Sequence, residues 1–586
     1  MIHNLGSKDM DLQLQAASQL HCLSQLGNDN RLLITVAGAI PPLVDLLGPQ
    51  SSVAVQETAS RTLWNLSVNV DNKVQIAAAG AIPPLVALLG PQCSNKMQEA
   101  AVGTLGNLSA NVNNKVLVAA AGAIPFLVDL LGPQSSVAVQ ENASRTLWNL
   151  SVNVDNQVLM DAAGAISPLV ALLGPQCSTK TQEAAVGALR NLSVNPNNKV
   201  LIVAAGAIPP LVALLGPQCS ACLQKAAAHA LATLSFGSFN NKRRHQENIN
   251  EVLIAVAVAI PPLVALLGPQ CCIELREAAA NALTCLTQDS FNNKILVAEA
   301  GAIPLLVALL GPQFNEKMQH MANMCLMNLS IDFDNKILIP AAGAIPLLVA
   351  FLDPQCSAMK KEVAARTLEF LSENDNNKAL ISEAGAIIPL TTLLCSMSPD
   401  GVQEAAATTL GNLSMHGDNR VLIASAGAIP LLVALLGPHC SAMMREAAAG
   451  ALGNLSADVE NKVKIAASGA IPPLVAMLCL QSSNEEQGAA ARTLMVLSTS
   501  DANQVLIAAA GAIPPLVAML DAKCQARVQE MAVCALHRLS GHVDNRIIMV
   551  NAGIGIPLTA LVSSPQSTRK MQRLGYNILK DIGHGM

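Results

Sequence analysis

One short motif, Gly-Ala-Ile-Pro-Pro-Leu-Val with close variants, recurs along the whole chain at a nearly constant spacing. Its alanine, or the residue that replaces it, stands at Ala39, Ala81, Ala123, Ala165, Ala207, Ala259, Ala302, Ala344, Ala386, Ala428, Ala470, Ala512 and Gly555. Successive positions lie 42 or 43 residues apart, except for one interval of 52 residues. A period of this length is typical of repeat proteins, in which each unit is one small supersecondary structure. The sequence therefore predicts one long array of units and not several independent globular domains.

Each unit is predicted to form three helices. Residues 198–206 begin with polar residues, continue with apolar ones and end at Gly206, which suits a left-handed C-cap. Residues 207–216 carry a proline pair in the first helical turn, where a missing N–H costs little. Residues 53–67 predict a longer third helix with one buried stripe, made of Val55, Ala59, Thr62, Leu63 and Leu66. Because none of these helices can bury its apolar face alone, neighbouring units must stack as a solenoid.

The array divides into three parts by the quality of its repeats. Residues 1–30 are predicted to form a partial capping repeat, because residues 9–26 look like a third helix without its own first and second helices. Residues 31–540 are the tandem repeats. Residues 541–586 predict a degenerate capping repeat, whose more polar outer end suits contact with solvent. The interval of 52 residues contains a ten-residue insertion near residues 242–251.

Two features mark individual repeats within this plan. The insertion carries the densest basic cluster of the chain, Lys242 to His245, which is either a tolerated surface loop or a docking or nuclear-localisation segment. Residues 39–72 resemble residues 123–156 more closely than they resemble the unit between, since both contain Ser-Arg-Thr-Leu-Trp-Asn-Leu-Ser. We infer that two repeats were duplicated together as a block of 84 residues.

The composition excludes several classes of function. Charged residues make up only 13% of the chain and the net charge is −5, which argues against a nucleic-acid binder and against a polybasic membrane-surface protein. Residues 200–224 carry no charge, a length that can span a bilayer. A proline pair interrupts this stretch and similar stretches recur in other repeats, so buried solenoid helices are the expected explanation.

The sequence predicts no catalytic or metal chemistry. Seven of the 15 cysteines lie in or beside one recurring loop, which argues against a disulfide framework and for a reducing compartment, the cytoplasm or the nucleus. Cys219 and Cys222 form a Cys-x-x-Cys pair, but no second ligand pair stands at zinc spacing. Phosphate-binding, metalloprotease and serine-hydrolase motifs are missing, and the amino terminus carries neither an apolar leader nor a myristoylation motif. No cofactor is therefore expected.

Two short helices and a longer third one, with Gly-Ala-Ile-Pro-Pro-Leu-Val opening the second helix and Asn-Leu-Ser closing the third, resemble the armadillo repeat. The resemblance covers the chain from about Asp9 to Ile582. It implies an all-α fold, namely a right-handed α-solenoid (superhelix) of about 12–13 three-helix armadillo repeats.

The resemblance also implies a binding surface. In this family the third helices line a concave groove, and an asparagine near the end of each one holds the backbone of an extended peptide, since a side-chain amide both donates and accepts hydrogen bonds. The matching residues are Asn65, Asn107, Asn149, Asn191, Asn328, Asn412 and Asn454. Other residues interrupt this asparagine ladder at Thr233, Cys285, Phe370, Val496 and Arg538. Two binding zones are therefore expected, over residues 65–191 and 412–454.

The position four residues before the ladder distinguishes this chain within the family. Importin-alpha proteins carry tryptophan there, which packs on basic cargo side chains, whereas no tryptophan occurs there in this chain. Arginine stands at this position at Arg61, Arg145, Arg366 and Arg492. A guanidinium binds carboxylates and phosphates through two parallel bonds, so these arginines suggest a groove for acidic or phosphorylated segments. The alternative is local pairing with glutamates such as Glu57 and Glu141.

Three other sets of residues are assigned structural roles. Trp64 and Trp148 stand directly before a ladder asparagine; packing between neighbouring repeats is the expected role, and binding anchors are the alternative. The glutamates of the recurring Gln-Glu pair are expected on a solvated face. His229 is expected to be a structural substitution.

These features predict a non-enzymatic scaffold or adaptor that works as a monomer and binds extended, acidic segments of other proteins in a concave groove. A substrate-binding subunit of a ubiquitin ligase is the alternative, since plant U-box ligases carry such arrays. The missing tryptophans disfavour a nuclear import adaptor, and the missing lipidation motif disfavours a vacuole- or membrane-attached organiser.

Overall fold

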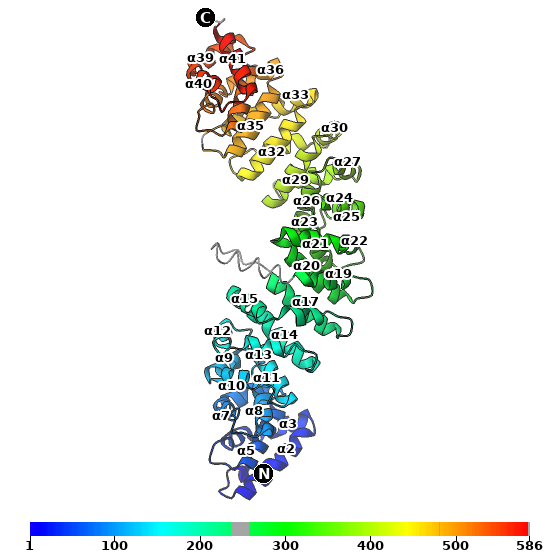
Figure 1. Ribbon diagram of the computed structural model, residues 1–586, viewed down its shortest axis with the longest axis vertical. Coiled ribbons are helices and arrows are strands. Elements are labelled where there is room, and N and C mark those ends of the chain that lie inside the picture. The colour runs from blue at the N-terminus through cyan, green and yellow to red at the C-terminus, as the bar shows by residue number, and fades with distance from the viewer. Residues whose placement is uncertain (236–256, 396, 480, 584–586) are drawn as a thin grey trace. The chain divides into compact units, whose positions relative to one another are not determined.

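The computed structural model describes residues 1–235, 257–395, 397–479 and 481–583. All regular elements in these ranges are helices (Figure 1). The helices form two compact units, Met1–Ala302 and Ile303–Met586. The basic insertion predicted near residues 242–251 lies outside the described residues.

The third helix of each repeat is the longest, and successive third helices pack against one another within each unit. In the first unit the third helices are α2 (Met10–Gln25), α5 (Val53–Leu66), α8 (Asn95–Leu108), α11 (Val137–Leu150), α14 (Thr179–Leu192), α17 (Ala221–Ser235) and α20 (Ile273–Gln288). In the second unit they are α23 (Glu316–Leu329), α26 (Ala358–Leu371), α29 (Asp400–Leu413), α32 (Ala442–Leu455), α35 (Asn484–Leu497), α38 (Ala526–Leu539) and α41 (Arg569–Gly583). The predicted stripe of Val55, Ala59, Thr62, Leu63 and Leu66 is buried, as expected.

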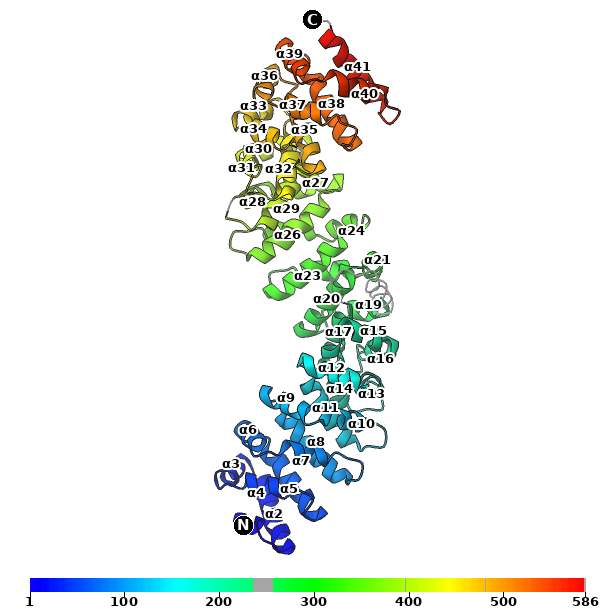
Figure 2. The ribbon, with the colours of Figure 1, turned by 90° about the vertical axis from the view of Figure 1, so that its left-hand side faces the viewer.

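The first helices are shorter and follow one another along one side of each unit. In the first unit they are α3 (Asn28–Val36), α6 (Val70–Ala78), α9 (Val112–Ala120), α12 (Val154–Ala162), α15 (Pro196–Ala204) and α21 (Phe291–Glu299). In the second unit they are α24 (Asn335–Ala341), α27 (Asp375–Glu383), α30 (Gly417–Ser425), α33 (Val459–Ala467), α36 (Asp501–Ala509) and α39 (Val543–Asn551). Figure 2 shows α30, α33, α36 and α39 in such a row.

The second helices span only six to nine residues and close each repeat. In the first unit they are α4 (Ile40–Asp45), α7 (Ile82–Ala87), α10 (Ala123–Asp129), α13 (Ile166–Ala171), α16 (Ile208–Ala213) and α19 (Ile260–Ala265). The others are α22 (Ala302–Ala308), α25 (Ala344–Ala350), α28 (Ile387–Leu393), α31 (Ala428–Ala434), α34 (Ile471–Ala476), α37 (Ile513–Ala518) and α40 (Gly555–Ser563). Two shorter elements are α1 (Ile2–Leu5) and the 3-10 turn η1 (Ala257–Ala259).

A glycine in the left-handed region joins the first helix to the second. Gly206 has φ of +79°, as predicted for its C-cap, and equivalent glycines recur along the array. Val258 replaces this glycine in one repeat, and a valine would be strained at positive φ. The backbone there forms the 3-10 turn Ala257–Ala259, and no described residue other than glycine has a positive φ.

A serine and a glutamine fix the start of the third helix. In α8 the Oγ atom of Ser94 accepts a hydrogen bond from the backbone N–H of Met97 at 3.3 Å. The Nε2 atom of Gln98 donates to the carbonyl oxygens of Leu89 and Gly90, at 3.2 and 2.9 Å. These bonds satisfy backbone groups that helix ends leave unpaired, so they set the angle between the second and third helices.

In most of the described repeats a buried asparagine ties the first helix to the third helix before it. The Nδ2 atom of Asn377 donates to the carbonyl oxygens of Leu371 and Lys336, both in the preceding repeat, at 2.9 and 2.8 Å. Equivalent buried residues include Asn72, Asn114, Asn156, Asn419, Asn461 and Asn545. These first-helix asparagines are more deeply buried than most of the predicted ladder.

The explanation offered for the uncharged stretch 200–224 is only partly correct. Ile202 and Leu211 are buried, but Leu201 is exposed, because only one stripe of each first helix faces the core. Among the described residues, no single helix is long and apolar enough to cross a membrane. In three places, two consecutive helices reach that length and composition when they are taken together, and the chain bends by 82° to 89° between them.

Candidate functional site

The predicted ladder asparagines occupy the same place in their helices, as the second-last residue of a third helix. Asn65, Asn107, Asn149 and Asn191 lie on α5, α8, α11 and α14 of the first unit. Asn328, Asn412 and Asn454 lie on α23, α29 and α32 of the second unit. All are half-buried except Asn328, which is buried. Asn328 therefore offers a ligand less access than the other six.

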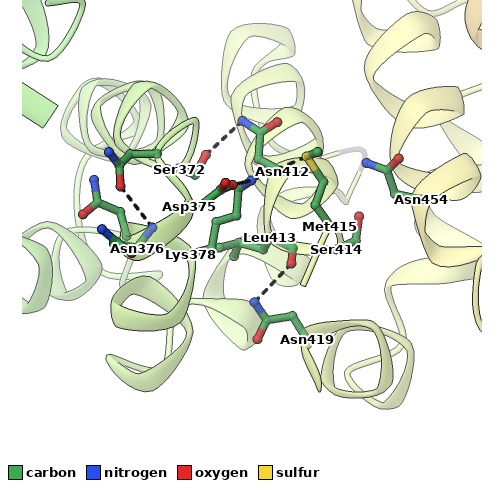
Figure 3. Close-up of polar contacts among 12 residues, drawn as sticks. Ser372, Asp375, Asn376, Lys378, Asn412, Leu413, Ser414, Met415, Asn419 and Asn454 are labelled. Carbon is green, nitrogen blue, oxygen red and sulfur yellow. Dashed lines mark hydrogen bonds and ion pairs between the residues drawn. The ribbon is translucent and has the colours of Figure 1, made fainter. Parts of the chain in front are cut away.

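A serine of the preceding repeat positions most of these amides. The hydroxyl of Ser67 donates to the carbonyl oxygen of Trp64 at 2.7 Å and accepts from Nδ2 of Asn107 at 2.9 Å. The same serine-to-asparagine bond occurs at Ser24–Asn65, Ser109–Asn149, Ser151–Asn191 and Ser372–Asn412. Figure 3 shows it between Ser372 and Asn412. The sequence signal was the serine of Asn-Leu-Ser, whose role the sequence analysis missed.

This bond leaves part of each amide for another partner. A side-chain amide has two N–H donors and one oxygen acceptor. In Asn191 and Asn412 the serine takes one donor, and within the described residues their Oδ1 atoms accept no hydrogen bond and are not buried. Asn107 differs, because its Oδ1 atom accepts from Nη2 of Arg145 at 3.3 Å. Peptide binding by the ladder stays a prediction, but the amides are held in place for it.

The predicted arginines behave differently from one another. Arg61 is exposed, whereas Arg145 is half-buried and its Nη2 atom bonds to Asn107 and Asn142. Pairing of Arg145 with Glu141 is wrong, because Glu141 pairs with Lys180 at 3.6 Å. Arg145 instead lies across Gly106 of α8, where an added Cβ atom would be 3.2 Å from its Nη2 atom.

Local pairing with glutamates is correct for Arg366. Its guanidinium lies 3.8, 3.9 and 3.7 Å from carboxylate oxygens of Glu362, Glu369 and Glu404. Glu404 belongs to a Gln-Glu pair, and its side chain is only 14% exposed. The prediction of a solvated face is therefore wrong for Glu404, because the stacking of α26 against α29 brings it to Arg366.

Each tryptophan packs across a glycine of the next repeat. A Cβ atom at Gly103 would lie 2.4 Å from Cε2 of Trp64, and one at Gly187 would lie 2.4 Å from Cε2 of Trp148. The expected packing role is confirmed, although Trp148 also stays 36% exposed. At Gly103 and Gly187, which alternate with Arg61 and Arg145 four residues before the ladder, an indole occupies the space where a side chain would stand.

A groove lies on the third helices of the second unit, at the predicted zone 412–454. Its volume is about 550 Å³, and Asn412 and Asn454 are among the residues that line it. The charged residues of its lining are Glu369, Glu404, Glu446, Glu485, Arg492 and Arg527. Carboxylates therefore outnumber guanidinium groups in this groove.

Burial changes the acidity of two of these carboxyl groups. Burial raises the pKa of Glu369 to about 7; Arg366 opposes this shift, and Glu404 and Glu373 add to it. Burial also raises the pKa of Glu446, with Glu485 and Glu486 adding to the shift and Arg527 and Arg492 opposing it. The groove therefore holds carboxyl groups that a cationic ligand would help to ionise.

Glu369 should make the stability of the second unit depend on pH. Its pKa is about 7 in the folded chain against an ordinary value of 4.5, so the neutral form is favoured by folding. The neutral carboxyl group therefore contributes to the free energy of unfolding in full below pH 4.5, and this contribution is lost as the pH rises through 7. We expect Glu369→Gln to be more stable than the unchanged protein above pH 8, by on the order of 1–2 kcal/mol because solvent and Arg366 reduce the effect.

Urea unfolding at a series of pH values checks this prediction. The advantage of Glu369→Gln should disappear below about pH 4.5. Glu383→Gln, which changes an exposed glutamate of α27, is the matched control and should follow the unchanged protein throughout. An advantage of Glu369→Gln that is the same at pH 4 and pH 8 would contradict the assignment.

All 15 cysteines, including Cys219 and Cys222, are free thiols. Among the described residues, no group of three or more His, Cys, Asp or Glu side chains is arranged to hold a metal ion. The candidate site is thus a surface of amides, carboxylates and guanidinium groups.

Three-helix repeats with a row of amides on their third helices define a helical repeat protein. Comparisons with known proteins show which family of repeat proteins it is. The family model of the armadillo/β-catenin-like repeat matches residues 27–68, 69–110, 111–152 and 153–194. The model of the plant U-box protein ARM repeat region matches residues 270–553. The chain belongs to the armadillo-repeat family.

Individual relatives match only a short segment. U-box domain-containing protein 11 of Arabidopsis thaliana is 41% identical over 68 residues, which are 12% of this chain and 11% of that protein. U-box domain-containing protein 4 of the same plant is 42% identical over 69 residues, 12% of this chain and 8% of that protein. The matched segment thus spans about a tenth of these relatives or less.

Two solved structures share the fold. The crystal structure of an engineered protein has a TM-score of 0.64 and 27% identity, covering 71% of this chain and 98% of that one. A structure from work on a phosphorylation switch between cadherin and β-catenin has a TM-score of 0.69 and 18% identity, covering 85% and 99%. The second likeness shows the fold alone.

Proposed function

We propose that this chain is a non-enzymatic scaffold that binds extended segments of other proteins along the ladder amides. The observation that carries the proposal is the groove of about 550 Å³, because Asn412 and Asn454 both line it. The scaffold works in the cytoplasm or nucleus, where its free cysteines stay reduced.

The amides suit an extended backbone for a physical reason. Each one can accept from a peptide N–H and donate to a peptide C=O, and the period of 42 residues repeats this pair along the array. Because a serine already orients most of the amides, a ligand does not have to order them on binding, which favours affinity. Backbone pairing of this kind holds a segment without selecting its side chains.

Charge supplies the selectivity, and it differs between the two units. In the first unit Arg61 is exposed, so acidic or phosphorylated segments are the proposed ligands there. In the second unit Arg366 is already surrounded by carboxylates, and the groove beside it has more glutamates than arginines. The preference for acidic segments is therefore proposed for the first unit only.

Peptides selected from a random displayed library on the full chain test the ladder. We expect Asn412→Ala/Asn454→Ala to weaken binding of peptides that occupy the second-unit groove by about tenfold or more. Each lost hydrogen bond between uncharged groups is worth about 1 kcal/mol. Isothermal titration measures this loss. Asn376→Ala, an exposed asparagine of α27, is the control and should bind like the unchanged chain.

The same peptides test the first unit with a second pair of variants. Arg61→Ala should weaken acidic peptides selectively and Arg61→Lys should retain part of their affinity, because lysine keeps the charge without the planar pair of donors. If no selected peptide loses affinity in any of the asparagine or arginine variants, ligands bind elsewhere and the groove proposal fails.

A role as the substrate-binding part of a ubiquitin ligase is the second candidate. The match of residues 270–553 to the plant U-box protein ARM repeat region favours it. In that case a protein captured by the groove should gain ubiquitin and be degraded faster when the chain is co-expressed. Equal half-lives with the unchanged chain and with Asn412→Ala/Asn454→Ala would leave scaffolding alone.

A further inference from the structure

The first helices that the structure describes leave apolar side chains in solvent. In α9, Val112 is 75% exposed and Val116 is 52% exposed, and Leu117 beside them is exposed as well. The core does not need these side chains, because Asn114 and Val118 of the same helix are the buried ones. Val112 and Val116 are four residues apart, so they lie on the same outward face of the helix.

The same positions are apolar and exposed in neighbouring repeats. In the first unit the outward pairs on α6, α9 and α12 are Val70, Val74, Val112, Val116, Val154 and Val158. In the second unit the equivalent exposed residues include Ile337, Val421, Val463, Val505 and Ile547. Since the first helices follow one another along each unit (Figures 1 and 2), these side chains form an apolar edge with one step in most repeats, which Asp375 and Ala379 interrupt in α27.

In several repeats the lysine that stands before the outward residue of the first helix is buried. Lys199, Lys294 and Lys336 stand directly before Val200, Ile295 and Ile337, and Lys378 stands before Ala379; all four lysines are less than 9% exposed. The Nζ atom of Lys378 lies 2.6 Å from Oδ1 of Asp375 and contacts the sulfur of Met415 (Figure 3). These lysines therefore add no charge to the edge, whereas the carboxylates of Asp375, Glu460 and Asp544 on the same helices are more than 80% exposed.

The edge is large enough to matter for association. Exposed apolar patches of several hundred Å² on a protein usually mark an interaction surface. A fully exposed valine side chain offers on the order of 100 Å², so the six outward valines of α6, α9 and α12, which are 52–75% exposed, offer roughly 400 Å². This is about half of the ~800 Å² per partner that specific interfaces bury, and the polar atoms between the valines add to it.

We propose that the apolar edge of the first helices is a self-association surface, covered by a second copy of this chain. The period of the array favours this occupant. A partner that buries the edge over several repeats must present apolar side chains at the same step, and another copy carries that step by construction. A two-fold axis would then pair each first helix with a first helix of the partner, because both copies use the same surface. This differs from the monomer that the sequence predicts.

Sedimentation velocity of the full chain over a wide concentration range tests the proposal. We expect a dimer that forms at micromolar concentration, and a Val116→Glu/Val158→Glu/Val421→Glu/Val463→Glu variant whose dissociation constant is at least tenfold higher. The control is Val53→Glu/Val137→Glu, which changes two valines that are equally exposed but lie at the start of third helices. It should associate like the unchanged chain, and melting followed by circular dichroism verifies that each variant folds.

Two outcomes would overturn self-association. One is a full chain that stays monomeric at the highest concentration reached, and the other is a four-valine variant that associates as tightly as the unchanged chain. Flotation with phosphatidylcholine vesicles separates the alternative occupant. A monomer that floats with such vesicles, and no longer does so in the four-valine variant, would assign the edge to a lipid surface and reject the second copy.

Discussion

Replacing Glu486 by alanine should destabilise the second unit by roughly 3–5 kcal/mol, the range typical when one partner of a buried ion pair is removed. Glu486 is only 2% exposed. Its Oε1 atom accepts from Nε of Arg445 at 2.7 Å, and its Oε2 atom accepts from the backbone N–H of Ser483 at 2.9 Å. The variant would lose both bonds and leave the guanidinium of Arg445 without its carboxylate.

The effect should be shared between two repeats, because Arg445 lies on α32 and Glu486 on α35. Arg445→Ala/Glu486→Ala should cost clearly less than the sum of the two single changes, since the double variant leaves no unpaired charge. Arg445→Met/Glu486→Leu should recover part of the lost free energy of unfolding, because apolar side chains of similar volume can fill the site. Urea unfolding measures these differences, and urea is preferred because it does not screen charge.

An exposed ion pair of the same unit is the control. Lys464 and Glu460 lie 3.8 Å apart on α33, with side chains that are 53% and 84% exposed. Glu460→Ala should change the free energy of unfolding by less than about 0.5 kcal/mol, since exposed pairs contribute little. If Glu486→Ala costs no more than Glu460→Ala, the buried pair does not hold the two repeats together.

Replacing Gly103 by alanine should destabilise the first unit by roughly 1–3 kcal/mol, although alanine is normally the better helix former. The added Cβ atom would lie 2.4 Å from the indole of Trp64, so the ring must leave its place on α8. In a Trp148→Phe background, where Trp64 is the remaining tryptophan, the emission maximum should move to longer wavelength as the ring enters water.

The sign of this effect should reverse when the indole is absent. In a Trp64→Ala background, Gly103→Ala should stabilise the chain by up to about 1 kcal/mol, because only the gain in helix propensity remains. Gly450 occupies the equivalent position on α32, and a Cβ atom there would meet only Nη2 of Arg492, at 3.4 Å. Gly450→Ala is therefore the matched control and should not destabilise. Equal losses with and without Trp64 would show that the indole is not the cause.

This contact gives the 84-residue block a physical meaning. Large residues from both sides fit the glycines of α8: Trp64 of the preceding repeat covers Gly103, and Arg145 of the following repeat lies across Gly106. A copy of the first repeat alone would bring the indole against an arginine, since Arg61 stands at the position of Gly103, and a copy of the second repeat alone would bring glycine against glycine. Duplication in pairs keeps each large side chain opposite a glycine, so the block carries its packing partners with it.

The sequence by itself determined the repeat, its three helices and the inward stripe of the third helix. These features depend on spacing within one unit, since the residues Val55, Ala59 and Leu63 share a helix face whatever lies next to it. The glycine at the end of the first helix was predictable for the same reason, because its left-handed conformation is a local property.

Only the tertiary structure decided which residues meet across repeats. The bonds of Ser67 to Asn107 and of Arg145 to Asn107, and the packing of Trp64 on Gly103, join residues about forty positions apart in sequence. They depend on how far each repeat is shifted and turned against the next, which no local pattern encodes. The same stacking decides that Val116 stays in solvent while Val118 is buried, and so it creates both the amide groove and the apolar edge.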